Sequence, residues 1–385
     1  MAYVHKDVHG GARWCLVHGS LEGPGTFAVC ELQRALQRRL PYVLEVRPGA
    51  PDSLKAERHL ALLGTREANP LIAGLIVDGK LPAPEGPGGY SLAVMDSPWA
   101  DGKKVIAVAG ADAPGVLHGA VDFCSRILAA KTTPDDPREM RAALDGIAPA
   151  AIAERPAIDD RGIWTWGYVV YDYRRFIDNM ARLKMNALTL WNDCAPLNAR
   201  EIVDYAHSRG VRVTFGFHWG WGIEGLDLGS PEHLEQVRSQ VLETWRREYR
   251  DLGADGIYFQ TATEHKTREI GGRSVASLAC GWVNGIAGAL LEEAPDLRVQ
   301  FGLHAISIGE HYADLAGLDP RVSIVWEDAG TIPYSYEPVP DVEEADWSVP
   351  EELLTAEKTL DYSKKLAALR PGCEFAMGAK GWIKL

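Results

Sequence analysis

Short apolar runs and amphipathic stretches alternate along the chain from residue 160 onward. In chain order the runs are GIWTWG, NALTLWND, VRVTFGFHWGW, GADGIYFQTATEH, RVQFGLHA, VSIVWED and CEFAMGAKGW. Continuous apolar runs of this length are typical of parallel strands that are covered on both faces. The pattern therefore predicts parallel strands that are connected by helices.

The stretches between these runs carry residues that start and stop helices. Asp172 can cap a helix over residues 172–185, and Gly210 follows the short helix after the second strand. Ser230 and Pro231 open a long helix that ends before Gly253. Further helices are predicted at about residues 274–293 and 350–370.

A regular strand–helix repeat of this length favours a closed barrel. We expect an α/β fold of the (β/α)8 or TIM-barrel type over residues 159–385. The eighth strand–helix unit is missing, because the sequence stops at Leu385, shortly after Trp382. We therefore expect a barrel that is truncated after strand seven and lacks its C-terminal end.

A different pattern precedes the barrel. Residues 1–130 contain the apolar runs WCLVHG, YVLEVRP, HLALLGT, GYSLAVMD and KVIAVAG, and the stretch TFAVCELQRALQRRL has helical spacing. This alternation predicts a small α/β sandwich domain. Residues 131–158 are rich in proline and charge, which indicates a linker.

Composition and charge restrict the class of partner. The chain has 385 residues, 46% of them apolar, and a formal net charge of −13, which argues against a nucleic acid or an anionic membrane as partner. The N-terminus lacks an apolar stretch of signal-peptide length, and no run approaches the roughly 20 apolar residues that span a bilayer. We therefore expect a cytoplasmic location.

Carboxylates follow two of the predicted strands at the edge where barrel enzymes do their chemistry. Glu264 comes after strand four, and Glu327 and Asp328 come after strand six. Two carboxylates at one edge are the minimum equipment for cleaving a glycosidic bond. Neighbours on a strand point to opposite faces, so either Glu327 or Asp328 faces the lumen, and we prefer Glu327.

Aromatic residues accompany these carboxylates. Indole rings commonly line carbohydrate sites, because an aromatic face tolerates the C–H side of a sugar ring. The alternative is that they fill a large core. The tryptophans at or near predicted strand ends are Trp164, Trp166, Trp191, Trp219, Trp221, Trp326 and Trp382.

Polar side chains join them at the same predicted edge. Amide and neutral imidazole groups offer both a donor and an acceptor, which suits the recognition of sugar hydroxyls. His218 and His304 could instead be core histidines with satisfied hydrogen bonds. The polar candidates for substrate binding are Asn192, Asp193, His218, His265, His304 and Lys380.

Two segments resemble those of known glycoside hydrolases. LLGTREANPLIAGLIVDGKLP, followed by KVIAVAGADAPGVLHGAVDF, resembles the small α/β domain that precedes the barrel in alpha-glucuronidases and beta-N-acetylhexosaminidases. RGIWTWGYVVYDYRRFIDNMARLKMNALTLWND resembles the start of their barrels, where an Arg-Gly strand leads to a helix that ends in Lys-x-Asn. The similarity covers most of the chain.

The resemblance implies roles for individual residues. In these enzymes the catalytic acid ends strand four, which corresponds to Glu264. Beta-N-acetylhexosaminidases carry an Asp-Glu pair there, whereas this chain has Thr263 and Glu264. Alpha-glucuronidases place further carboxylates on later strands, as this chain does after strand six. A glucuronate carboxylate would need a cation, for which Lys266, Arg268 and Lys380 are candidates.

The leading hypothesis is a glycoside hydrolase that acts on an oligosaccharide or glycoside without a cofactor or metal. Glu264 would protonate the leaving oxygen, and Glu327 or Asp328 would activate water or attack the anomeric carbon. One alternative is a metal-dependent sugar isomerase with ligands drawn from Asp193, His218, Glu264, His304 and Asp328. Another is a barrel that binds glycans without cleaving them.

Overall fold

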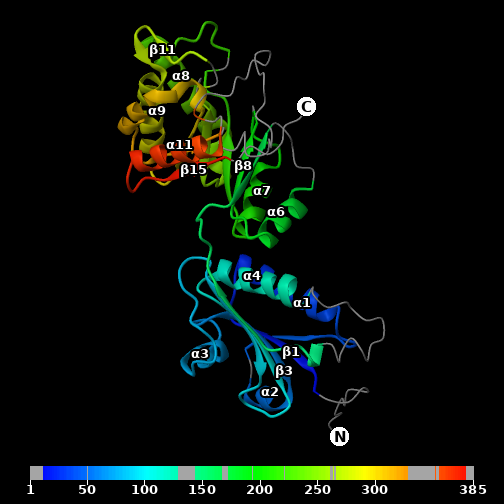
Figure 1. Cartoon of the computed structure of the whole chain (residues 1–385). Helices are drawn as coiled ribbons and strands as arrows, with labels where there is room; N and C mark the ends of the chain where they lie inside the picture. The colour runs from blue at the N-terminus through cyan, green and yellow to red at the C-terminus, as the bar shows by residue number, and fades with distance from the viewer. Residues whose placement is uncertain are drawn as a thin grey trace. The chain divides into compact units, whose positions relative to one another are not determined.

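The chain forms two compact units, which Figure 1 shows as ribbons. The computed structural model describes residues 12–49, 51–128, 144–166, 172–192, 194–220, 222–260, 263, 266–327, 352 and 355–378. Unit 1 comprises residues 1–161, 172–186 and 205–211, and unit 2 comprises residues 162–171, 187–204 and 212–385. The predicted limits of the domains and the linker remain predictions.

Unit 1 is built on a six-stranded sheet with the order β2-β1-β3-β5-β4-β6. Strands β2, β1, β3 and β5 run parallel, whereas β4 is antiparallel to both β5 and β6. The strands are β1 (Trp14–His18), β2 (Glu45–Pro48), β3 (His59–Thr65), β4 (Tyr90–Asp96), β5 (Lys104–Gly110) and β6 (Ala150–Glu154).

Helices cover both faces of this sheet, so unit 1 has three layers. Helices α1 (Pro24–Gln37) and α4 (Ala113–Asp122) lie on one face, and α2 (Asp52–Glu57) and α3 (Pro70–Val77) lie on the other (Figure 1). A separate apolar cluster fills the space on each side of the sheet. This arrangement confirms the predicted small α/β sandwich. Helix α4 continues as a π-helical turn over Phe123–Leu128.

The predicted linker contains the strand β6. Its sequence AAIAE has little strand signal, but it pairs along β4 from Ala150 to Glu154. Glu154 is held by Arg126, at 2.7 Å, and by the hydroxyl of Tyr90, at 3.0 Å. Tertiary pairing therefore makes a strand from a segment whose composition indicates a linker.

Unit 2 is built on a seven-stranded parallel sheet with the order β15-β14-β13-β10-β9-β8-β7. The sheet is curled, as in a TIM barrel, which confirms the predicted fold class. All seven predicted strands are present. They are β7 (Gly162–Trp166), β8 (Ala187–Trp191), β9 (Arg212–Gly216), β10 (Gly256–Gln260), β13 (Arg298–Leu303), β14 (Val322–Trp326) and β15 (Phe375–Met377).

Helices follow these strands at the predicted places. Ser230 accepts a hydrogen bond from the backbone N–H of His233 at the start of α8, and Gly253 adopts a left-handed φ of 75° after the last helical turn. The elements are α7 (Ala199–His207), α8 (Pro231–Thr244), η2 (Trp245–Tyr249), η3 (Arg250–Leu252), α9 (Val275–Glu293), α10 (Ala305–Ile308), η4 (Gly309–Gly317), α11 (Ala356–Leu369) and the hairpin β11 (Glu269–Ile270) and β12 (Arg273–Ser274).

Helix α9 is unusually apolar for its length. Its 19 residues are long and apolar enough to cross a membrane by length and composition alone, which the apolar runs of the sequence did not suggest. Most of its most apolar window, 61%, is buried inside the protein. This burial is typical of a core helix in a barrel.

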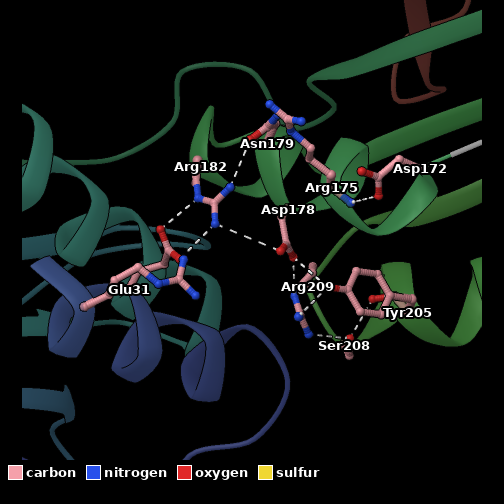
Figure 2. A network of polar contacts seen from close by, with 10 residues as sticks. Glu31, Asp172, Arg175, Asp178, Asn179, Arg182, Tyr205, Ser208 and Arg209 are labelled. Carbon is pink, nitrogen blue, oxygen red and sulfur yellow. Dashed lines mark hydrogen bonds and ion pairs between the residues drawn. The ribbon is translucent and has the colours of Figure 1, made fainter.

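Helix α6 (Tyr173–Arg182) follows β7 in the chain and belongs to unit 1. Asp172 caps it by accepting a hydrogen bond from the N–H of Arg175, as predicted. The guanidinium of Arg182 donates to both carboxylate oxygens of Glu31 on α1, at 2.8 and 2.9 Å (Figure 2). A fork of two parallel bonds is the strongest geometry for such a pair.

A second ion pair lies beside the first in the same network. Asp178 on α6 accepts hydrogen bonds from Arg209, at 2.8 Å, and from the hydroxyl of Tyr205, at 3.0 Å (Figure 2). The guanidinium groups of Arg182 and Arg209 also lie over the ring of Phe27, 5.5 and 4.6 Å from its centre. Helix α1 therefore binds the segments 172–186 and 205–211 through charge and through an aromatic ring.

A third network surrounds the buried carboxylate of Asp122. It accepts hydrogen bonds from the hydroxyl of Tyr90 and from Arg126, and the ammonium of Lys184 lies 2.6 Å away. Lys184 is the only non-glycine residue with a positive φ, 60°, in the part of the chain that the structure describes. Burial raises the pKa of Asp122, but the hydrogen bonds from Lys184 and Tyr90 outweigh it and leave this pKa below its usual value.

Loss of the Arg182–Glu31 pair should destabilise unit 1. We expect Glu31→Gln to lower the free energy of unfolding by about 1–2 kcal/mol, because a bidentate, partly buried pair loses its charge. Glu293→Gln is the control, since Glu293 pairs with the more exposed Arg246 and should cost less than about 0.5 kcal/mol. Urea denaturation measures both values. Equal losses would contradict the account.

Unit 1 should also lose stability in acid. A lowered pKa in the folded state means that the stabilisation by Asp122 is present above about pH 4 and is lost as the pH falls further. Melting temperatures between pH 7 and pH 3 should fall less steeply for Asp122→Asn than for the natural sequence. Asp96→Asn, which removes an exposed partner of Lys104, is the control and should keep the natural slope.

Candidate active site

The strongest candidate site surrounds Glu327, the first residue after β14. Its side chain is only 1% exposed. Its Oε1 accepts a hydrogen bond from the hydroxyl of Tyr258 on β10, and its Oε2 lies 3.2 Å from Nε2 of His304, which follows β13. Three neighbouring strands therefore bring an acid, a phenol and an imidazole together at or near their carboxyl ends.

The backbone explains why Glu327 faces these groups. Its N–H donates to the carbonyl of Leu303 at 3.0 Å, which extends the pairing of β13 and β14 by one residue. The preceding residue, Trp326, packs its ring against Tyr362 of α11, with 5.4 Å between ring centres. Successive side chains on a strand point to opposite faces, so Glu327 points away from this helix.

Gly302 on β13 provides the space for the contact between Tyr258 and Glu327. A β-carbon at this position would overlap both the Tyr258 hydroxyl and Oε1 of Glu327. Any side chain other than hydrogen would therefore displace one of the two groups. Neither Gly302 nor Tyr258 is a candidate from the sequence, since one looks like an ordinary strand glycine and the other like a core residue.

The imidazole of His304 is held from its other side. Its Nδ1 lies 3.4 Å from the hydroxyl of Thr263, which is fully buried. The carbonyl of Thr263 accepts a hydrogen bond from the Ser307 hydroxyl at 2.5 Å. With these contacts on one side, Nε2 of the ring lies 3.2 Å from Oε2 of Glu327.

Aromatic rings surround Tyr258. Its ring centre lies 5.3 Å from that of Trp164 and 5.6 Å from that of Trp191. Trp191 also packs edge-on against His218, at 5.5 Å, and its six-membered ring occupies the space above Gly216 where a β-carbon would lie. The structure thus brings two of the predicted tryptophans, Trp164 and Trp191, and two predicted histidines, His218 and His304, into the group that contains Glu327.

Two other predicted tryptophans lie apart from this group. Trp219 stacks on Phe259, with 3.6 Å between ring centres, and Phe259 follows Tyr258 on the strand and so points to the opposite face. Trp326 packs against Tyr362, as described above. Both rings therefore belong to the layer between the sheet and its helices. The amide of Asn192 is partly exposed, and its backbone N–H donates to Gly216 at 3.1 Å.

The remaining sequence candidates cannot be placed from the described residues. Trp166 ends β7, but only its backbone is described. The candidates that lie outside the described residues are Glu264, Asp328, Asp193, Trp221, His265, Lys380 and Trp382. Of the five residues of the metal hypothesis, the structure therefore describes His218 and His304, whose partners are Trp191 and Glu327 respectively.

Arg268, one of the cations considered for a glucuronate, is already occupied. Its Nε donates to the carbonyl of Ile306, and its other nitrogens bind the carboxylates of Glu310 and Glu352. These partners raise the pKa of Arg268 against the lowering effect of burial. The guanidinium therefore anchors the chain before the β11–β12 hairpin. Lys266 is exposed.

A cavity of about 360 Å³ lies at the opposite edge of the same sheet. It includes the first residues of β10 and β13, Gly256 and Arg298. Arg298 donates to Glu374 at 2.8 Å, and Asp255 accepts a hydrogen bond from the N–H of Val213 at 2.7 Å. Barrel enzymes react substrates at the carboxyl edge, so this amino-edge cavity is not the candidate active site.

Comparisons with known proteins support the fold. A scan of protein-family models and a search of curated proteins gave no match. Among solved structures, the chain is similar to CpGH84D, with a TM-score of 0.52, 12% identity and 82% of this chain covered. It is also similar to CpGH84B, with a TM-score of 0.53, 13% identity and 81% of this chain covered.

The coverage and the sequence identity of these matches determine what they establish about this chain. The chain spans about half the length of each neighbour, 52% in both cases. At 12 and 13% identity, the match establishes a common fold and leaves the activity of this chain to be argued from its own residues. The chain thus shares a fold with part of CpGH84D and part of CpGH84B.

Proposed function

We propose that this protein is a glycoside hydrolase in which Glu327 is the second of two catalytic carboxylates. The observation that carries the proposal is the buried carboxylate of Glu327, held by Tyr258 and His304 beside an aromatic wall at the carboxyl edge of the sheet. The similar solved structures are of glycoside hydrolases, which supports the same class of reaction.

The chemistry needs one acid and one base. Glu264 keeps the role that the sequence predicts, donation of a proton to the leaving oxygen as the glycosidic C–O bond breaks. The anomeric carbon then gains a new oxygen, either from water whose proton passes to Glu327 or from Glu327 itself, with water releasing the sugar in a second step. Glu327 must be ionised for either course, and the hydrogen bond from the Tyr258 hydroxyl favours that form.

Trp164, which is partly exposed, is suited to hold the sugar ring, and the buried Trp191 packs edge-on against it. Trp164 also packs against Tyr258, whose hydroxyl binds Glu327, so a sugar on the face of Trp164 would lie next to the carboxylate. Asn192 and His218 lie at the carboxyl ends of β8 and β9 and offer polar groups for sugar hydroxyls.

Thr263 favours two protein carboxylates over assistance by an acetamido group. Beta-N-acetylhexosaminidases carry an aspartate at this position and use the acetamido group of the substrate as nucleophile. Here the side chain is a threonine that is fully buried and contacts His304. We therefore place hydrolysis by Glu264 and Glu327 ahead of hexosaminidase-type chemistry.

Replacement of Glu327 should abolish turnover. We expect Glu327→Gln to reduce kcat by about 10²–10⁴-fold, because the base is lost while the shape of the site is kept. A panel of chromogenic glycosides that includes alpha-glucuronides and N-acetyl-beta-hexosaminides identifies the substrate, and the variant is then assayed on it. Glu374→Gln is the control, since Glu374 is an exposed carboxylate that binds Arg298 at the amino edge of the sheet.

The outcomes separate the alternatives. Azide or formate should restore part of the turnover of Glu327→Ala, because a small anion can occupy the space of the carboxylate. Full activity in Glu327→Gln would refute the assignment. Saccharide binding by the natural protein without any product release would favour a binding barrel, and activity that requires stoichiometric metal would favour an isomerase.

A further inference from the structure

We propose that Tyr258 is a positioning residue that keeps Glu327 ionised and in one orientation, and that Gly302 makes this contact possible. The inference rests on the proposed function and concerns the charge state of Glu327 in the same site. Tyr258 lies within β10, is 2% exposed, and directs its hydroxyl at Oε1 of Glu327. A phenol that donates to a carboxylate stabilises the charged form of that carboxylate.

The phenol ring has little freedom to turn away. Trp164 meets it at an interplanar angle of 56° and Trp191 at 78°, with ring centres less than 6 Å away in both cases. The main chain of β10 is fixed by pairing with β9 on one side and β13 on the other. The hydroxyl is therefore presented to Glu327 by a rigid element.

Tyr258 and His304 lie against different oxygens of Glu327. Tyr258 binds Oε1, and His304 approaches Oε2. Together they restrict the orientation of the carboxylate. A group with both oxygens located in this way is pre-organised for a reaction at one place.

The contact between Tyr258 and Glu327 also requires that residue 302 has no β-carbon. The β-carbon of an alanine at this position would overlap the Tyr258 hydroxyl and Oε1 of Glu327, which are the two atoms of the hydrogen bond. Strand β13 also pairs with β10 and β14, so its backbone cannot move away without breaking the sheet. Gly302→Ala should therefore act on catalysis through Tyr258 and Glu327, although residue 302 has no side chain.

The test is the pH dependence of turnover. Tyr258→Phe should move the acidic limb of kcat upward by about one to two pH units, because one hydrogen bond to the charged form is lost. At the pH optimum, kcat should fall at least about tenfold while KM changes less than about threefold, since the phenol acts on the carboxylate rather than on the sugar. Gly302→Ala should change the profile in the same direction.

Two controls exclude a general effect of altering the core. Tyr362→Phe removes a buried tyrosine hydroxyl that donates to the carbonyl of Gly309 on the other face of the sheet, and it should leave the acidic limb in place. Gly288→Ala, at a glycine of α9 with open space around it, should also leave the limb in place. An unmoved limb in Tyr258→Phe, or an equal shift in Tyr362→Phe, would overturn the proposal.

A cycle of variants tests the contact without an assay of turnover. Tyr258→Phe should lower the urea midpoint of the natural protein more than it lowers the midpoint of Glu327→Gln, because the two groups stabilise each other. Equal losses in both backgrounds would refute the contact, even in an active hydrolase. A coupled pair in a protein that cleaves no glycoside would instead refute the proposed function, and with it the role of Tyr258.

Discussion

A carboxylate that is almost completely buried must have hydrogen-bond donors, and this requirement organises the centre of unit 2. Without donors, the charge of Glu327 would cost several kcal/mol and the group would take up a proton. Tyr258 on β10 donates a hydrogen bond to Oε1, and the imidazole of His304, after β13, lies 3.2 Å from Oε2. The charged form is the form that a base or nucleophile needs, so the same contacts serve stability and the proposed chemistry.

The register of the strands and the small size of two strand residues place Glu327 beside these groups. Glu327 continues the pairing of β14 with β13 by one hydrogen bond, which sets the direction of its side chain. Gly302 and Gly216 leave room inside the curl of the sheet, one for the Tyr258–Glu327 pair and one for the ring of Trp191. Small residues on the strands thus allow large and charged side chains to occupy the lumen.

The sequence was sufficient for the strands of the barrel-type sheet. Apolar runs located all seven strands of the barrel-type sheet, because fully covered parallel strands leave a continuous signal. Strand alternation allowed one of Glu327 and Asp328 to face the lumen, and Glu327 does so. Strand β6 was missed, since its pairing with β4 depends on Arg126 and Tyr90, which are distant in sequence.

The details of the site were harder to predict for a physical reason. A strand that is buried on both faces has no polar side, so its pattern does not separate residues of the lumen from those beneath the helices. Trp219 and Trp326 therefore looked equivalent to Trp164 and Trp191, although they pack against Phe259 and Tyr362. Tyr258 and Gly302 could not be identified as site residues from the sequence, because their role depends on a contact across three strands.

The most direct measurement is a crystal structure of the Glu327→Gln variant with an uncleaved glycoside. The account predicts a sugar ring against Trp164, with its anomeric carbon about 3–3.5 Å from residue 327 or one bridging water away. A glycoside bound with its anomeric carbon beyond the reach of one water from residue 327 would contradict the account.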